Sequence, residues 1–119
     1  MDSLRYLKKL KVEYQVKLLV LLEPMSEEGR LEYVKRVVGF PSAISLVEGK
    51  IWVLWDPILN ITFSTLAEQL VDMEISFPVG SFFFSAVYAR CTGVARRPLW
   101  SAMERLASSR QGSWMVAGD

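Results

Sequence analysis

A short apolar run near the N-terminus, Val16–Leu22, is the feature that most constrains the fold of this 119-residue chain. The run contains six aliphatic residues with a single lysine, Lys17, among them, and Glu23 and Pro24 follow directly. A short apolar run that ends at a proline is typical of a β-strand covered on both faces. We therefore expect a core strand here, with Glu23 at the point where the strand becomes a loop.

A second apolar run, Ser113–Ala117, has the same shape, and Gly118 and Asp119 follow it. In open α/β sheets, ligands bind beyond the carboxyl ends of the strands. Carboxylate oxygens at such positions suit hard cations. The two runs together therefore predict a cation site to which Glu23 and Asp119 contribute.

Composition argues against several classes of protein. Half of the residues are hydrophobic (51%), which argues against disorder, and the net charge of +1 gives no sign of a nucleic-acid partner. The sequence has no histidine, so the commonest general base and zinc ligand are missing. With Cys91 as its single cysteine and no signal-peptide pattern, we expect an intracellular protein, nuclear or cytoplasmic. No apolar run is long enough to span a membrane, so no membrane partner is expected.

Two helices are predicted on either side of the first strand. Residues 4–13 carry leucines at helical spacing, and Ser3 is a candidate N-cap. The second helix is predicted to begin at Ser26, to include Leu31–Val38 and to end at Gly39. A helix, a strand and a helix in succession indicate an α/β fold.

The middle of the chain contains five strand-like segments rich in β-branched and aromatic residues. They are Ala43–Val47, Lys50–Trp55, Ile58–Leu66, Leu70–Phe77 and Ser81–Ala89. Glu48-Gly49 predicts a tight hairpin between the first two. Helical spacing returns over Val94–Ala107, with Pro98 in the first turns, before the last strand. We expect the α/β class, with a mixed but mostly antiparallel sheet and helices on one face.

Three segments occur in the order and spacing of one family. LLVLLEPM (Leu18–Met25), FSAVYARC (Phe84–Cys91) and WMVAGD (Trp114–Asp119) resemble motifs of the endonuclease/exonuclease/phosphatase superfamily, which has the DNase I-like fold. The chain most resembles the apurinic-type endonuclease domain of plant LINE-type (non-LTR) retrotransposons. GKIWVLW (Gly49–Trp55) and RRPLW (Arg96–Trp100) also resemble that branch, so the likeness covers most of the chain from Leu18 onward.

The resemblance implies a four-layer α/β sandwich that cleaves phosphodiester bonds in DNA with Mg²⁺ or Mn²⁺. Glu23 matches the family's metal-binding glutamate, Tyr88 its active-site tyrosine, and Asp119 the aspartate of its G-D-F-N motif. Mg²⁺ is usually held by one or two carboxylates together with substrate phosphate. A carboxylate can orient or deprotonate the attacking water, and a phenol can donate a hydrogen bond to phosphate.

The sequence also departs from the family pattern. Cys91 stands where the family commonly has asparagine, and the family's first strand, with its metal-site asparagine, has no counterpart before Ser3. The half that carries the catalytic histidine is missing. We therefore expect residues 1–119 to be a single truncated domain, the first half of the sandwich, whose missing C-terminal half is its partner. Since losing members of a catalytic unit costs orders of magnitude in rate, we expect little or no nuclease activity from the chain alone.

Other interpretations stay open. A non-catalytic remnant or interaction domain would expose an apolar sheet face at Phe82–Val87 and self-associate through it. A small-molecule or phosphoinositide phosphatase of the same superfamily would use the same chemistry. By default, Glu23 and Asp119 are solvated acids and Tyr88 is an aromatic at the rim of the core. Arg96-Arg97 is more often a solvated pair than a contact to a phosphate backbone.

Overall fold

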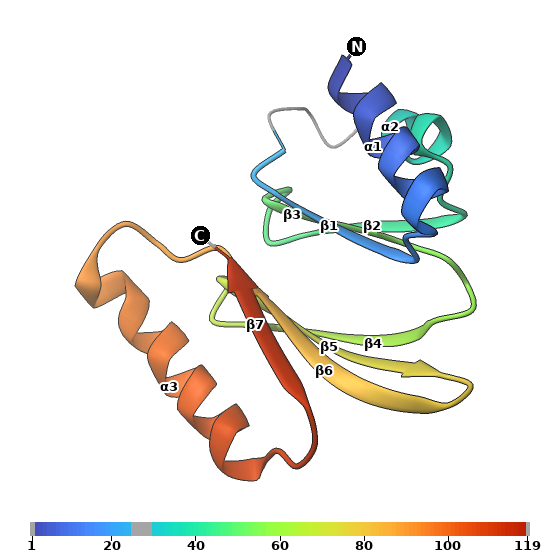
Figure 1. The fold of residues 1–119 in the computed structure, drawn as a ribbon. Helices are drawn as coiled ribbons and strands as arrows, with labels where there is room; N and C mark the ends of the chain where they lie inside the picture. The colour runs from blue at the N-terminus through green and yellow to red at the C-terminus, as the bar shows by residue number, and fades with distance from the viewer. Residues whose placement is uncertain (1, 25–29, 119) are drawn as a thin grey trace. The chain divides into compact units, whose positions relative to one another are not determined.

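The computed structural model describes residues 2–24 and 30–118, which form two compact units, Met1–Leu59 and Asn60–Asp119. Each unit contains one β-sheet, with two helices in the first unit and one in the second (Figure 1). The sheet of the first unit is antiparallel and that of the second is mixed. The expected α/β class is therefore confirmed, while the single-domain interpretation stays a prediction.

The first unit is a three-stranded sheet with two helices on one face. Its elements are α1 (Asp2–Tyr14), β1 (Leu18–Leu22), α2 (Leu31–Val38), β2 (Ser42–Leu46) and β3 (Ile51–Trp55). Leu4 of α1 and Val34 and Val38 of α2 form one core cluster with Trp52 and Leu54 of β3. Gly39 ends α2 in a left-handed conformation (φ 95°), as predicted, because glycine has no Cβ to hinder it. The predicted start of that helix at Ser26 lies outside the described residues.

The expectation that the Val16–Leu22 run forms a core strand covered on both faces is wrong. The sheet order is β1-β3-β2, so β1 lies at an edge and all five of its residues are only part-buried. The central strand is β3, whose residues Ile51–Leu54 are fully buried. An apolar run indicates that a strand is suited to the core. The pairing order of the strands decides which strand lies at the centre of the sheet.

The second unit is a four-stranded sheet, β4-β5-β6-β7, with one helix against it. Its elements are β4 (Asn60–Leu66), β5 (Leu70–Phe77), β6 (Gly80–Val87), α3 (Gly93–Ser109) and β7 (Trp114–Gly118). The first three strands form an antiparallel meander, and α3 connects β6 to β7, which runs parallel to β6. Leu99 of α3 is completely buried against Leu70 and Val87.

Two predicted strands, Ile58–Leu66 and Ser81–Ala89, extend two residues beyond the observed strands at one end. β4 begins at Asn60 rather than Ile58, because the Asp56 carboxylate accepts the Ile58 N–H at 3.0 Å and forms a turn. β6 spans Gly80–Val87 rather than Ser81–Ala89. The Tyr88 N–H still donates to the Gln69 carbonyl, which continues the antiparallel register one position beyond the strand. The predicted hairpin at Glu48-Gly49 is confirmed: both residues have positive φ, as type I′ turns require, and the Lys50 N–H donates to the Val47 carbonyl.

The apolar face expected at Phe82–Val87 is not exposed. Ser85, Ala86 and Val87 are buried, and the three phenylalanines before them are part-buried. Exposed apolar side chains lie instead on the neighbouring strand, at Met115 and Val116 of β7. No helix of the described residues combines the length and the apolar character needed to cross a bilayer.

A buried polar network fixes β7 against the rest of its sheet. Arg110, just after α3, donates two hydrogen bonds to the Asp72 carboxylate of β5, at 2.8 and 2.6 Å. Ser85 of β6 also donates to Asp72, at 2.7 Å, and the indole N–H of Trp114 donates to Ser85 at 2.9 Å. The Arg110 guanidinium lies 3.8 Å from the centre of the Phe83 ring. The network therefore connects β5, β6 and β7 with the C-terminal end of α3.

We predict that Asp72→Ala lowers the free energy of unfolding by about 3 kcal/mol or more, because it leaves a buried guanidinium without its counter-ion. The side chains of Arg110 and Asp72 are only 9% and 11% exposed. Urea denaturation measures the change. Glu68→Ala is the matched control: it breaks the exposed Arg90–Glu68 pair and should cost less than about 1 kcal/mol. Equal losses in the two variants would contradict a structural role for the buried pair.

Candidate functional site

Tyr88, predicted as an active-site residue, lies directly after the carboxyl end of β6. Its backbone N–H donates to the Gln69 carbonyl at 2.7 Å, and its side chain is half-buried. The chain then continues through Arg90 to Thr92, whose hydroxyl accepts the Ala95 N–H and caps α3. Tyr88 therefore stands at a strand-to-helix junction, a common place for ligand-binding residues in α/β folds.

Gln69 holds this junction in place. It is 1% exposed, and its side-chain amide donates to the Ala95 carbonyl at 2.8 Å while its side-chain oxygen accepts the Arg90 N–H at 2.8 Å. Its own backbone N–H donates to Leu66 across the β4–β5 turn. One buried glutamine thus joins that turn, the exit of β6 and the first turn of α3. Since each of these partners is a backbone group, the path of the chain around Tyr88 depends on it.

The carboxyl ends of β6 and β7 lie side by side. The two strands are parallel, with Val87 opposite Gly118, so Tyr88 follows β6 at the end of the sheet where β7 also finishes. The strands approach so closely that a Cβ added to Gly118 would lie 2.1 Å from the Val87 carbonyl oxygen. Only glycine fits this position. Asp119 itself lies outside the described residues, so its predicted role stays a prediction.

Glu23, the predicted metal ligand, belongs to the first unit. It directly follows β1, its side chain is exposed, and its backbone N–H donates to the Lys50 carbonyl at 2.6 Å. Its φ of 48° is left-handed, which is uncommon for a residue other than glycine and costs about 1–2 kcal/mol. The strained backbone and its hydrogen bond fix the point from which the exposed Glu23 side chain extends, which is compatible with a binding role. The predicted grouping of Glu23 with Tyr88 and Asp119 stays a prediction, because these residues are divided between the two units.

The chemistry of Glu23 fits the predicted cation. Its carboxylate is an oxygen donor open to solvent, as a Mg²⁺ ion that keeps most of its waters requires. Among the residues that the structure describes, no three His, Cys, Asp or Glu side chains come together as a metal-binding group.

Several arginines surround the junction after β6. Arg90 pairs with the Glu68 carboxylate at 2.9 Å, and Arg96 donates from its Nε to the Arg90 carbonyl at 2.5 Å. Arg97 is exposed in the second turn of α3. The Arg96-Arg97 pair, considered as a phosphate contact, thus stands on the helix that begins next to Tyr88, with Arg96 partly engaged in holding the loop.

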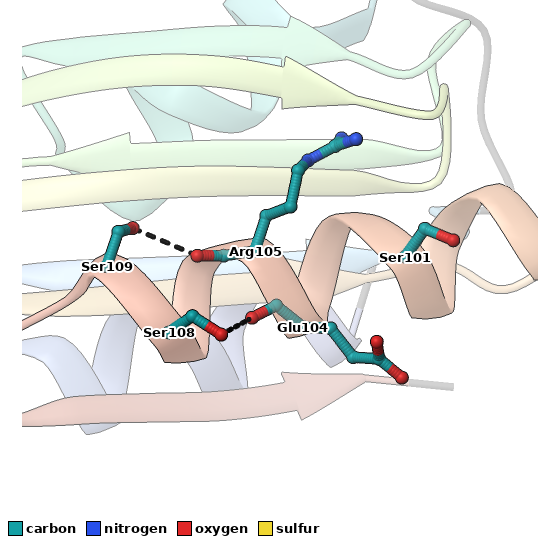
Figure 2. Close-up of a pocket in the computed structure, with 5 residues that line it drawn as sticks. All are labelled: Ser101, Glu104, Arg105, Ser108 and Ser109. Atoms are coloured by element: carbon teal, nitrogen blue, oxygen red, sulfur yellow. Dashed lines mark hydrogen bonds between the residues drawn. The ribbon is translucent and has the colours of Figure 1, made fainter.

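A shallow polar hollow on α3 is a weaker candidate site. Figure 2 shows its lining residues, Ser101, Glu104, Arg105, Ser108 and Ser109. The hydroxyls of Ser108 and Ser109 donate to the helix carbonyls of Glu104 and Arg105, each at 2.9 Å. The charged ends of Glu104 and Arg105 point in opposite directions. Since these groups do not converge on a common point, the hollow offers no catalytic arrangement.

In comparisons with known proteins, neither a family model nor a curated protein matches the chain. The family resemblance therefore rests on the sequence segments quoted above.

Sequence patterns missed the residues that position the two ends of α3. Gln69 was not singled out, although a glutamine directly before the apolar stretch of β5 is a signal that it could be buried and bonded. Asp72 and Arg110 are 38 positions apart, and nothing local relates them. Their partnership depends on the return of the chain through α3.

We predict that Gln69→Met lowers the free energy of unfolding by about 2 kcal/mol, because it leaves the Arg90 N–H without its acceptor. Hydrogen exchange of the Arg90 amide should become much faster than in the unaltered protein. Gln111→Met, at an exposed glutamine, is the control and should change stability by less than about 0.5 kcal/mol. Unchanged protection of the Arg90 amide would show that Gln69 does not hold the junction.

Proposed function

We propose that this chain is part of a metal-dependent phosphodiesterase of the endonuclease/exonuclease/phosphatase type, with DNA as its substrate. The observation that carries the proposal is the parallel pairing of β6 and β7 through α3. It brings the strand portions of FSAVYARC and WMVAGD, two of the three resembling segments, side by side, with the carboxyl ends of β6 and β7 at the same end of the sheet. The carboxyl ends of strands are where α/β folds bind ligands.

In this proposal, each residue has one task. Glu23 holds a Mg²⁺ or Mn²⁺ ion, which supplies positive charge next to the phosphate. Tyr88 donates a hydrogen bond from its phenol to a phosphate oxygen. Asp119 orients or deprotonates the attacking water. Gln69 and Gly118 are positioning residues, since the first fixes the backbone at Tyr88 and the second lets β7 approach Val87.

The exposed arginine after the junction suits the proposed substrate. Arg97 lies on the helix that begins beside Tyr88, where it could contact the phosphate backbone without reading the base sequence. The chain contains no histidine, so a general base of that type must come from elsewhere. We therefore propose that catalysis needs a further segment, and that the chain alone has little or no nuclease activity.

Binding of Mn²⁺ tests the proposed metal site without requiring activity. Paramagnetic Mn²⁺ should broaden the amide NMR signals around Glu23 and around Tyr88 over the same range of metal concentration. Glu23→Ala should remove both effects. Glu13→Ala, at an exposed acid near the C-terminal end of α1, should remove neither. Broadening that survives Glu23→Ala, or that occurs at only one of the two positions, would contradict a shared site.

A nicking assay on supercoiled plasmid with Mg²⁺ tests the activity of the chain alone. We expect little or no nicking by the unaltered protein. The unaltered protein could instead nick the plasmid robustly, with the activity lost in Glu23→Ala and kept in Glu13→Ala. That result would overturn the expectation of low activity and support the proposed reaction. Robust nicking that persists in Glu23→Ala would argue against the metal site itself.

A further inference from the structure

In the part of the chain that the structure describes, the outer edge of β7 is unpaired and apolar. Within the described part of the chain, β7 is the last strand of its sheet and pairs with β6 alone. Met115 is 58% exposed and Val116 41%, and the strand carries neither a charged residue nor a proline. The opposite edge strand, β4, is different, since its exposed positions are occupied by polar residues: Asn60, Thr62, Ser64 and Thr65. Native edge strands are usually protected by charges, prolines or bulges, and β7 contains neither a charge nor a proline.

The register shows which backbone groups of β7 face outward. The Phe83 N–H donates to the Ser113 carbonyl at 2.9 Å, so Ser113 faces β6. In a parallel ladder the groups of alternate residues face the same neighbour, and Met115 and Ala117 therefore also face β6. The N–H and C=O groups of Trp114, Val116 and Gly118 consequently point away from the sheet, where a further strand would pair with them.

We propose that this edge pairs with the β7 edge of a second copy of the chain, antiparallel and centred on Val116. In this register Val116 lies opposite its own counterpart, and Trp114 lies opposite Gly118 of the other copy. These are the residues whose backbone groups point outward, so each pair exchanges both of its hydrogen bonds. The two strands are related by a twofold axis, the commonest symmetry of protein dimers.

Side-chain size favours a second copy over an unrelated strand. The sequence Trp-Met-Val-Ala-Gly decreases in size along β7. When it is paired with itself in the antiparallel direction, each large residue therefore lies opposite a small one. Trp114 lies opposite Gly118 of the other copy, and Met115 lies opposite Ala117. Because β7 carries no charge, no like charges meet across the axis.

The protein holds β7 in the required geometry before a partner arrives. Trp114 is fixed by its hydrogen bond to Ser85 and lies beside the Arg110 guanidinium, 5.3 Å from its ring centre. A preformed strand loses less conformational entropy on pairing than a flexible one. The inference does not rest on the proposed nuclease function, since it uses the lateral edge of β7 rather than its carboxyl end.

Sedimentation equilibrium of the full chain tests the dimer. We expect a monomer–dimer equilibrium whose dissociation constant rises roughly tenfold or more in Val116→Lys, because two lysines then face each other across the axis. The control Thr62→Lys adds the same charge to the other edge of the sheet and should leave the equilibrium unchanged. A monomer at every concentration would overturn the proposal, and so would equal weakening by the two substitutions.

A cross-linking experiment tests the register and stays informative if Val116→Lys fails to fold. Cys91 is exposed, so both variants carry Cys91→Ser. Residues in a hydrogen-bonded antiparallel pair have Cα atoms about 5.5 Å apart, within the range that a disulfide spans. Val116→Cys should therefore form a covalent dimer on mild oxidation, and Thr62→Cys should not. Failure of Val116→Cys to cross-link, or equal cross-linking of both variants, would overturn the register.

Discussion

The buried pair of Asp72 and Arg110 is the interaction on which the second unit depends. β7 is not connected to β6 by a short turn, since the chain leaves the sheet, forms α3 and returns. Arg110 stands at the start of that return, and its bidentate bond to Asp72 fixes where the chain meets the sheet again. Burying two charges costs several kcal/mol per ion, and good geometry must offset it. Here the Ser85 hydroxyl adds a hydrogen bond to the carboxylate, and the Phe83 ring covers the guanidinium.

Gln69 performs the corresponding task at the other end of α3. It bonds to backbone groups where the chain leaves β6 and where the helix begins. Between these two anchors, Leu99 and Ala102 bury the helix against the sheet. The crossover from β6 to β7 is thus fixed by polar bonds at both ends and by apolar packing in between. Polar bonds are directional, and they define a path that apolar contacts alone would leave less specific.

The two proposals use different parts of β7. The phosphodiesterase proposal depends on the carboxyl end, where Gly118 lies against Val87 and the chain continues to Asp119. The dimer proposal depends on the lateral edge, where the backbone groups of Val116 point away from β6. A strand can bind a ligand at its end and a partner along its edge without conflict, so either proposal can fail without affecting the other. Both require β7 to be held in place, and the bond of Arg110 to Asp72 fixes where this strand begins.

Local sequence patterns were enough to locate the elements. Leucine spacing predicted α1, Gly39 the end of α2, and Glu48-Gly49 the hairpin, because each of these depends on residues close together in the chain. The apolar run at Val16–Leu22 predicted a strand but not its place, since its edge position follows from β3 pairing on both of its sides. In the candidate site, the role of Tyr88 comes from the family resemblance and stays a prediction, whereas the buried bonds of Gln69 were visible only in the fold.

What the sequence by itself determined is which segments are helices and strands and which side chains have the chemistry to bind a cation. Tertiary structure alone decided the pairing order of the strands, the partnership of Asp72 with Arg110 and the exposure of the β7 edge. The physical reason is the separation along the chain over which each kind of interaction acts. Helical spacing, caps and turns act over a few residues, whereas burial and ion pairing join groups that meet only after the chain has folded.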